Sequence, residues 1–264
     1  MSTPVCISAV GLAGPGLSGW EASLPVLSGT EPYVPAEAPP YQPQLLPPNE
    51  RRRATPAVRQ AFRAAEDAVA RSPRPAAELA TVFASSDADM SIIHRICSAL
   101  SEDSRIISPT DFHNSVHNAA AGYWSIAVGA RGPSNTVCAY DASFAAGLLE
   151  AAALVATDGC DTLLVAYDVM PPEPLNSKRP IGNCFSVALV LSPAAAVPGA
   201  PRLRLSVGAE GAPTPMQHAG LEVLRLSNPA ARALPLLRLL AAKTSGVVLL
   251  DSDGSGLLRV EVTA

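Results

Sequence analysis

The sequence predicts an α/β fold in which helices cover the faces of a largely parallel sheet. A strand expected over residues 79–84 precedes a helix over 90–100, and a short strand over 134–139 precedes a long apolar helix over 142–157. Parallel neighbours need such helical crossovers, so this alternation indicates strands in one direction with helices packed on them. Hydrophobic residues make up 48% of the chain and charged residues 16%, as in a well-packed globular protein.

Composition and charge exclude several classes of protein. The chain has 264 residues, enough for one sizeable core or two small ones. Its formal net charge of -4 gives no basic surface for nucleic acid, and no apolar run reaches the ~18 residues that a membrane span needs. The first residues lack the basic stretch of a signal peptide. We therefore expect a cytoplasmic protein that binds no nucleic acid and has no membrane span.

The cysteines favour the same compartment. They form no C-x-x-C pair, and most of them fall in expected strands or helices. We expect buried free thiols in a reducing cytoplasm. The cysteines are Cys6, Cys97, Cys138, Cys160 and Cys184.

The first 50 residues combine two short elements with a long loop. The β-branched run over residues 5–10, followed by GLAGPGL, predicts a strand and a glycine-rich turn. Residues 20–27 predict a short helix. Residues 30–50 are rich in proline, which indicates a surface loop or strap along the body of the protein.

A helix is expected from Thr55 to about residue 70. Thr55 can cap its first turn, and Pro56 suits its first position because that residue needs no free amide. The run Arg51–Arg53 before it has two readings. It is a solvated approach to the helix, or it is an anchor for an acidic partner such as an acyl carrier protein.

The C-terminal part predicts further strands, one helix and a hairpin. The helix begins at Asn228 or Pro229 and ends at Ala242. The hairpin is VVLLDSDGSGLLRVEV, with Asp253-Gly254 in its turn. The further strands are expected over residues 162–167, 184–192 and 203–207.

The most informative stretch runs from residue 108 to residue 157. It predicts a buried helix, a turn at 129–133, a strand over SNTVCA and the long apolar helix. The corner between this strand and this helix lies at Tyr140, Asp141 and Ala142. Several enzyme folds place a nucleophile at such a corner, and this chain has an aspartate there.

The order of residues in this stretch resembles the active-site region of β-ketoacyl-acyl carrier protein synthases. Those enzymes carry ISP, N-x-x-A-G, GPS/N and T-A-C-A/T-S runs, and the match here is ungapped over about forty residues. The matching residues are Ile107-Ser108-Pro109, Asn118, Ala121, Gly122, Gly132-Pro133-Ser134 and Ala139-Tyr140-Asp141-Ala142-Ser143. The resemblance implies a thiolase-like fold: one βαβαβ-type layered half with a mixed five-stranded sheet over 1–210, and a truncated second half over 211–264, in one globular unit.

The chain departs from this family where the chemistry takes place. The family's catalytic cysteine falls on Asp141, and the histidine and lysine motifs of the second half are missing. An acyl-aspartate is a mixed anhydride that hydrolyses easily, so we do not expect Asp141 to act as a nucleophile. We expect it to cap the long helix, with a charge that mimics the thiolate and holds the corner in shape. Cys138, three residues earlier, is expected to be a buried structural thiol.

The resemblance therefore implies a non-catalytic chain-length factor. Such a subunit pairs with an active ketosynthase as a heterodimer in type II polyketide biosynthesis, shapes the acyl tunnel and meets the acyl carrier protein through the complex. The short form resembles the synthase-like partner of aryl polyene pigment systems. Family dimers pair the strand equivalent to SNTVCA, which would otherwise be an open edge. The expected tunnel and interface residues are Phe112, Val116, His117, Tyr123, Ser134, Asn135, Thr136, Val137 and Cys138.

Two other readings of the residues stay open. A spacing of four would put His113 and His117 on one helix face, but no third ligand accompanies them, so we expect neither a metal nor a cofactor. The chain could instead be a hydrolase or decarboxylase that acts on acyl carrier thioesters through Asp141. It could also be a homodimeric scaffold without an acyl ligand. Tyr123, expected above at the tunnel or interface, could instead be a residue of the hydrophobic core.

Overall fold

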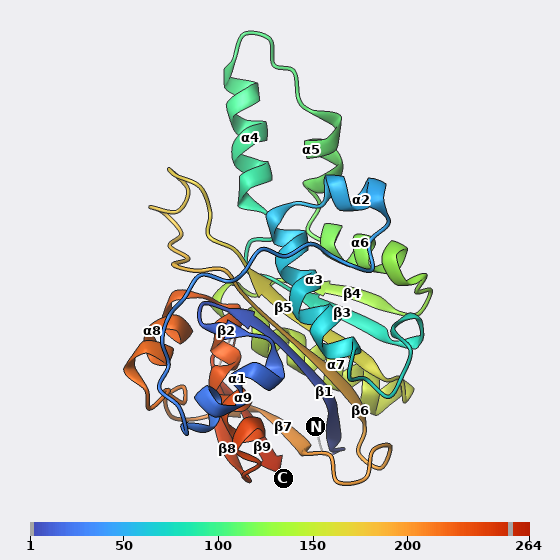
Figure 1. Cartoon of the computed structure of the whole chain (residues 1–264), viewed down its shortest axis with the longest axis vertical. Coiled ribbons are helices and arrows are strands. Elements are labelled where there is room, and N and C mark those ends of the chain that lie inside the picture. The colour runs from blue at the N-terminus through green and yellow to red at the C-terminus, as the bar shows by residue number, and fades with distance from the viewer. Residues whose placement is uncertain (1–2, 253–255) are drawn as a thin grey trace.

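The centre of the molecule is one mixed sheet, which contains nine strands in the described residues, 3–252 and 256–264, of the computed structural model (Figure 1). Eight of them follow the order β4-β3-β5-β6-β1-β7-β9-β8, and β2 pairs with β1. The bounds are β1 Val5–Gly14, β2 Leu17–Ser18, β3 Ala80–Ala84, β4 Ser134–Val137, β5 Thr162–Asp168, β6 Phe185–Pro193, β7 Arg202–Ala209, β8 Gly246–Leu250 and β9 Leu257–Thr263.

The expected mixed five-stranded sheet is present within this larger one. β3 runs parallel to β4 and β5, while β6 runs antiparallel to β5 and β1. The sheet then continues, because β7 pairs with the start of β1 at Val5 and Cys6 and carries β9 and β8 beyond it. Strands from residues 211–264 therefore lengthen the sheet of the first 210 residues, although the domain division itself stays a prediction.

Helices cover both faces of the sheet and leave two apolar cores. One face carries α3 (Pro56–Val69) and α6 (Ala119–Val128), and their core includes Phe62 and Trp124, which meet edge to face with ring centroids 5.2 Å apart. The other face carries the remaining core helices. These are α1 (Trp20–Ser28), α7 (Ser143–Asp158), α8 (Ala219–Ser227), η3 (Ala230–Ala233) and α9 (Leu234–Ala242).

Helix α3 follows the sequence prediction closely. The Thr55 side chain accepts a hydrogen bond from the Val58 amide at 3.3 Å, and Pro56 is the first helical residue. Small buried alanines let the helix backbone lie against β1. The contact is so close that a Cβ added at Gly11 would lie 2.0 Å from the Ala64 carbonyl oxygen. This pair of elements therefore requires glycine at position 11.

The expected helix after residue 108 is two helices, not one. α5 (Pro109–Asn114) ends at Ser115, whose hydroxyl donates to the Phe112 carbonyl at 2.8 Å, and α6 begins only at Ala119. α5 is not buried as expected, because it projects from the sheet together with α4 (Met90–Ser101), as Figure 1 shows. The guanidinium of Arg95 joins the two helices by donating to both carboxylate oxygens of Asp111, at 2.8 and 3.1 Å.

The C-terminal hairpin is confirmed in its strands. β8 pairs antiparallel with β9, with Val248 opposite Val260; the expected turn at Asp253-Gly254 lies outside the described residues. At the outer edge of β8, Thr214 occupies both backbone groups of Leu249: its amide donates to the Leu249 carbonyl at 2.9 Å, and its hydroxyl accepts from the Leu249 amide at 2.8 Å. The short helix α8 was not expected.

Three short elements complete the chain: α2 Pro48–Arg53, η1 Ala76–Glu78 and η2 Tyr140–Ala142. Among the described helices, none has the length and apolar character to cross a membrane. Arg51 in α2 supports the proline-rich strap, because its guanidinium donates to the carbonyls of Gln44 and Leu46 at 3.1 and 2.8 Å. Arg52 and Arg53 are exposed.

Candidate functional site

The corner between β4 and α7 is a tight turn held by its own residues. Tyr140 has a φ of 51°, in the left-handed region that side chains other than glycine rarely adopt. The hydroxyl of Ser143 accepts from the Ala139 amide at 3.0 Å and donates to the Tyr140 carbonyl at 2.7 Å. These two bonds stabilise the turn and aim the side chains of residues 140 and 141 outward, where Tyr140 is 59% exposed.

Asp141 does not cap α7, so this prediction was wrong. The residue before the helix is Ala142, which makes no side-chain cap, because Asp141 itself lies in the middle of the short 3-10 turn η2 that precedes α7. The Asp141 carboxylate instead forms ion pairs, at 2.7 Å with Arg179 and 3.9 Å with Arg232. It is thus held by residues that follow it by 38 and 91 positions (179 − 141 and 232 − 141).

The two arginines connect Asp141 to a wider network of charges. Arg179 also lies 3.5 Å from Asp87, and its guanidinium stacks over the Tyr140 ring at 3.6 Å. Arg232 lies 3.4 Å from Asp251. Burial lowers the pKa of Arg179, but the hydrogen bond and charge of Asp141 outweigh it, and the pKa ends above its usual value. The network fixes the corner and joins the segment after β5 to η3 and the end of β8.

A buried carboxylate beside this corner was missed by sequence reasoning. Asp168, at the end of β5, accepts hydrogen bonds from the Ser85 hydroxyl at 3.0 Å, the Ser86 amide at 2.8 Å and the Ala230 amide at 3.1 Å. Burial raises its pKa to about 7, and the serine donors only partly oppose that shift. The Asn228 side-chain amide donates to the Asp168 carbonyl at 3.2 Å. The one feature of the sequence that could have revealed this buried carboxylate is an acidic residue directly after an apolar run.

The thiols do not lie where they were expected. Cys138 is exposed, and its Sγ donates to the Ser86 carbonyl at 3.0 Å. The alternation of a strand fails for it because β4 is an edge strand that ends at Val137, one residue earlier. All five cysteines are free, but only Cys6 is buried. The prediction of buried thiols was therefore wrong for most of them.

The residues expected at a tunnel or interface lie in different surroundings. Phe112 and Val116 are 70% and 51% exposed. His117 is half-buried, with Nε2 3.3 Å from the Ser85 carbonyl oxygen, and Tyr123 is buried in the core beneath α3. Strand β4 pairs only with β3 in the described part of the chain, which leaves Ser134, Asn135, Thr136 and Val137 along an open edge.

His113 and His117 do not share a helix face. His113 belongs to α5, whereas His117 lies in the break between α5 and α6, because Ser115 ends the first helix. Within residues 3–252 and 256–264, no group of three or more histidine, cysteine, aspartate or glutamate side chains has a geometry suited to a metal ion.

Comparison with known proteins places this fold in context. Residues 28–248 match the family model described as the N-terminal domain of beta-ketoacyl synthase. No curated protein matches the chain.

Similar solved structures differ in how much of their own chain is covered. A chain of the ketosynthase ApeO in complex with its chain length factor ApeC from Xenorhabdus doucetiae has a TM-score of 0.72 at 22% identity, over 100% of both chains. A chain of the ishigamide ketosynthase/chain length factor has a TM-score of 0.73 at 14% identity, over 99% of both. Ketosynthase twelve of the bacillaene polyketide synthase from Bacillus amyloliquefaciens has a TM-score of 0.56 at 15% identity, over 85% of this chain and 49% of that one.

Proposed function

Because the chain belongs to the beta-ketoacyl synthase family, we propose that it is the non-catalytic chain-length-factor subunit of a ketosynthase heterodimer in type II polyketide biosynthesis, of the aryl polyene kind. The observation that carries the proposal is the corner at Asp141. The family places its catalytic cysteine there, and this chain has a carboxylate in ion pairs with Arg179 and Arg232. Coverage of the whole chain by chains from ketosynthase/chain length factor structures supports the same role.

The open edge of β4 supports a partner subunit. An unpaired edge strand invites association with another strand, and Ser134 to Val137 are the residues that would pair, with Cys138 following them. Apolar side chains of the projecting segment lie exposed, among them Ile106 at 76%, in the loop between α4 and α5, and Phe112 at 70%, in α5. Such side chains favour burial against another protein. We place the ketosynthase on this surface, and the acyl carrier protein reaches the chain only through that complex.

The proposed role of the projecting residues is steric. Phe112 and Val116, and His117 beside them, border the acyl tunnel of the ketosynthase, so that their bulk limits how many extension cycles fit. Tyr123 supports this region from the core, where it packs beneath α3. The five free cysteines fit a complex that works in the reducing cytoplasm.

The experiment is co-expression with a ketosynthase from the same gene neighbourhood, with the mass of the purified material measured by light scattering. We expect a one-to-one complex. Gly122→Arg tests the surface, because Gly122 borders a shallow depression with Ser134 and Asn135 and an added Cβ meets nothing within 4 Å. It should weaken the complex by more than about tenfold without unfolding the chain. The matched control is Val223→Arg, at a 64% exposed position on α8.

The outcomes separate the alternatives. A chain that does not bind the ketosynthase and forms a stable homodimer favours the homodimeric scaffold. Equal effects of the two arginine variants on the complex contradict the proposal that the ketosynthase binds at the β4 edge. Asp141→Asn in the complex should leave product formation intact, whereas a loss of product supports a hydrolase or decarboxylase that uses this carboxylate. Phe112→Ala should lengthen the product and leave the free energy of unfolding within about 0.5 kcal/mol, since its side chain is exposed.

A further inference from the structure

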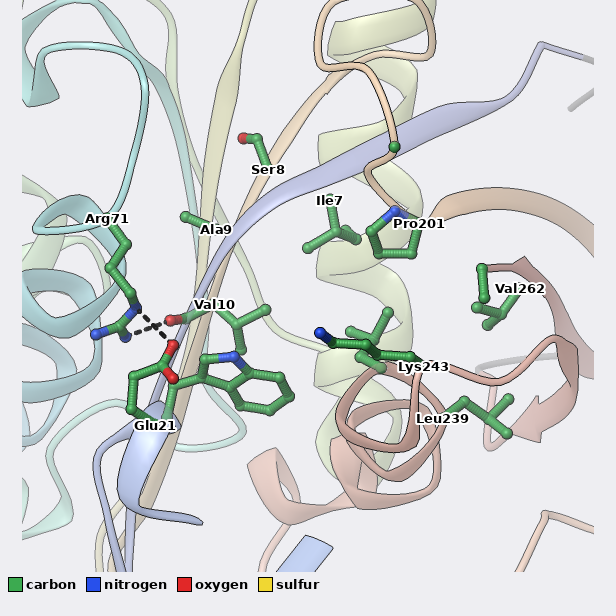
Figure 2. Close-up of a pocket in the computed structure, with 14 residues that line it drawn as sticks. Ile7, Ser8, Ala9, Val10, Glu21, Arg71, Pro201, Leu239, Lys243 and Val262 are labelled. Atoms are coloured by element: carbon green, nitrogen blue, oxygen red, sulfur yellow. Dashed lines mark hydrogen bonds and ion pairs between the residues drawn. The ribbon is translucent and has the colours of Figure 1, made fainter. Parts of the chain in front are cut away.

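A second concave region shares no lining residue with the corner at Asp141. It is a cleft of about 620 Å³ at the point where β1 parts from β7, near the start of β1 and the end of α9 (Figure 2). β1 pairs with β7 only at Val5 and Cys6, so the two strands separate after residue 6. On its other side β1 pairs with β6, and that pairing has a bulge between Ile7 and Ala9, a feature that often re-aims side chains beside a site.

The walls of the cleft carry apolar and polar groups in similar amounts. The apolar side chains come from β1, α1, α9 and β9 and include an indole ring, and the polar groups come from Ser8, Glu21, Arg71 and Lys243. The volume of the cleft is within the range of small-molecule sites, which are typically lined by apolar and aromatic side chains with a few polar groups. The apolar wall residues are Ile7, Val10, Trp20, Leu239, Leu240 and Val262.

Two cationic side chains line the cleft, Arg71 and Lys243, and in the described part of the chain only Arg71 forms ion pairs with acidic side chains. Arg71 donates to the Val10 carbonyl at 2.7 Å and forms ion pairs with Asp67 at 2.8 Å and Glu21 at 3.8 Å. Lys243 takes part in none of the ion pairs among the described residues. Figure 2 shows its ammonium group pointing across the cleft towards Val10. Lys243 is itself exposed, so its ammonium group is a solvated charge that lines the cleft and has no ion-pair partner among the described residues.

The backbone at Lys243 makes this lysine an unexpected choice. It ends α9 with a φ of 50°, the left-handed conformation in which glycine is the usual residue. A residue with a side chain is less stable than glycine in this conformation, so glycine can replace Lys243 without strain.

We propose that the cleft binds a small organic monocarboxylate. Its anionic group pairs with Lys243, and its apolar body lies on the walls formed by Ile7, Trp20 and Leu239. Arg71 is already paired with Asp67 and Glu21, whereas Lys243 has no ion-pair partner among the described residues, so a carboxylate in the cleft would pair with Lys243. This proposal rests on the cleft alone and does not depend on the function proposed above.

The test is calorimetric titration of the full chain, or of its ketosynthase complex, with phenylacetate, octanoate and the neutral analogue phenylacetamide. We expect saturable binding of the carboxylates and about fivefold weaker binding of the amide, because a solvent-exposed ion pair contributes up to about 1 kcal/mol. Lys243→Gly should weaken the carboxylates to the same extent. That variant removes the charge at a backbone position that favours glycine, so it should keep the fold.

The controls make the result decisive. Arg238→Gln removes a cation on the same helix that does not line the cleft, and it should leave binding unchanged. Lys243→Gln provides a second variant if a thermal melt shows that the glycine variant unfolds. The proposal is overturned if neither carboxylate binds saturably, or if the amide and the Lys243 variants bind as tightly as the carboxylate and the parent chain. Neither result bears on the β4 surface, which lies elsewhere on the sheet.

Discussion

Replacement of Asp168 by asparagine should change how the stability of the chain depends on pH. The carboxyl group is 2% exposed and accepts three hydrogen bonds, from Ser85, Ser86 and the Ala230 amide. Burial raises its pKa from 3.8 to about 7. The folded chain therefore holds a proton that the unfolded chain releases between these two pH values.

The sign and size of the effect follow from this difference in pKa. The stabilisation is complete below the unfolded pKa of 3.8 and is lost as the pH rises through about 7. About three pH units at 1.36 kcal/mol each give roughly 4 kcal/mol as the largest contribution. The asparagine side chain has no such proton to lose. Its amide would also place a donor against the Ala230 amide, which lowers stability at every pH.

The assay is urea unfolding of the chain and of Asp168→Asn between pH 4 and pH 8. The difference between their free energies of unfolding should shrink as the pH rises, because other carboxylates contribute equally to both curves. Asp158→Asn is the matched control at an exposed position, and its curve should parallel that of the parent. The reasoning is refuted if the Asp168→Asn curve is also parallel, or if the difference grows with pH.

Three other substitutions test packing and buried hydrogen bonds by urea unfolding. Gly11→Ala should lower the free energy of unfolding by about 3 kcal/mol, since its Cβ would lie 2.0 Å from the Ala64 carbonyl oxygen; a neutral result would contradict the close contact of α3 and β1. Gly122→Ala, with nothing within 4 Å, should raise it by about 0.8 kcal/mol, and a loss would show a hidden clash. Asp67→Ala should lower the free energy of unfolding by about 3 kcal/mol, because the Asp67 carboxylate accepts hydrogen bonds from the backbone amides of Leu12 and Trp20 at 2.9 and 2.8 Å. A loss under 1 kcal/mol would mean that water takes over these hydrogen bonds in the variant.

Local patterns were sufficient for the elements whose causes are local. Helix α3 could be predicted because Thr55 caps its first turn and Pro56 begins it, and β5 because its residues form one apolar run. The same reasoning joined α5 and α6 into one helix, since nothing in the apolar pattern reveals the break at Ser115. Helix α8 was missed because it has only nine residues and because the segment before it contains two prolines.

The details of the candidate site depend on contacts that sequence patterns do not contain. An aspartate at a strand-to-helix corner most often caps the helix, which is why Asp141 was assigned that role. Its actual partners, Arg179 and Arg232, are distant in sequence, and nothing in the local sequence reveals the left-handed conformation of Tyr140 or the 3-10 turn that contains Asp141. Asp168 was missed for a similar reason, because two of its donors precede it by more than 80 residues.

The two outermost strands of the sheet, β4 and β8, differ in how freely they can pair with a strand of another chain. A sheet can polymerise only if both of its ends accept a strand. At β8, Thr214 already occupies the backbone groups of Leu249, whereas β4 has no such cover in the described residues. One outer strand, β4, is therefore uncovered in the described residues, and the other, β8, has the backbone groups of Leu249 already occupied. This asymmetry favours the addition of one strand at β4 over repeated addition at both edges of the sheet.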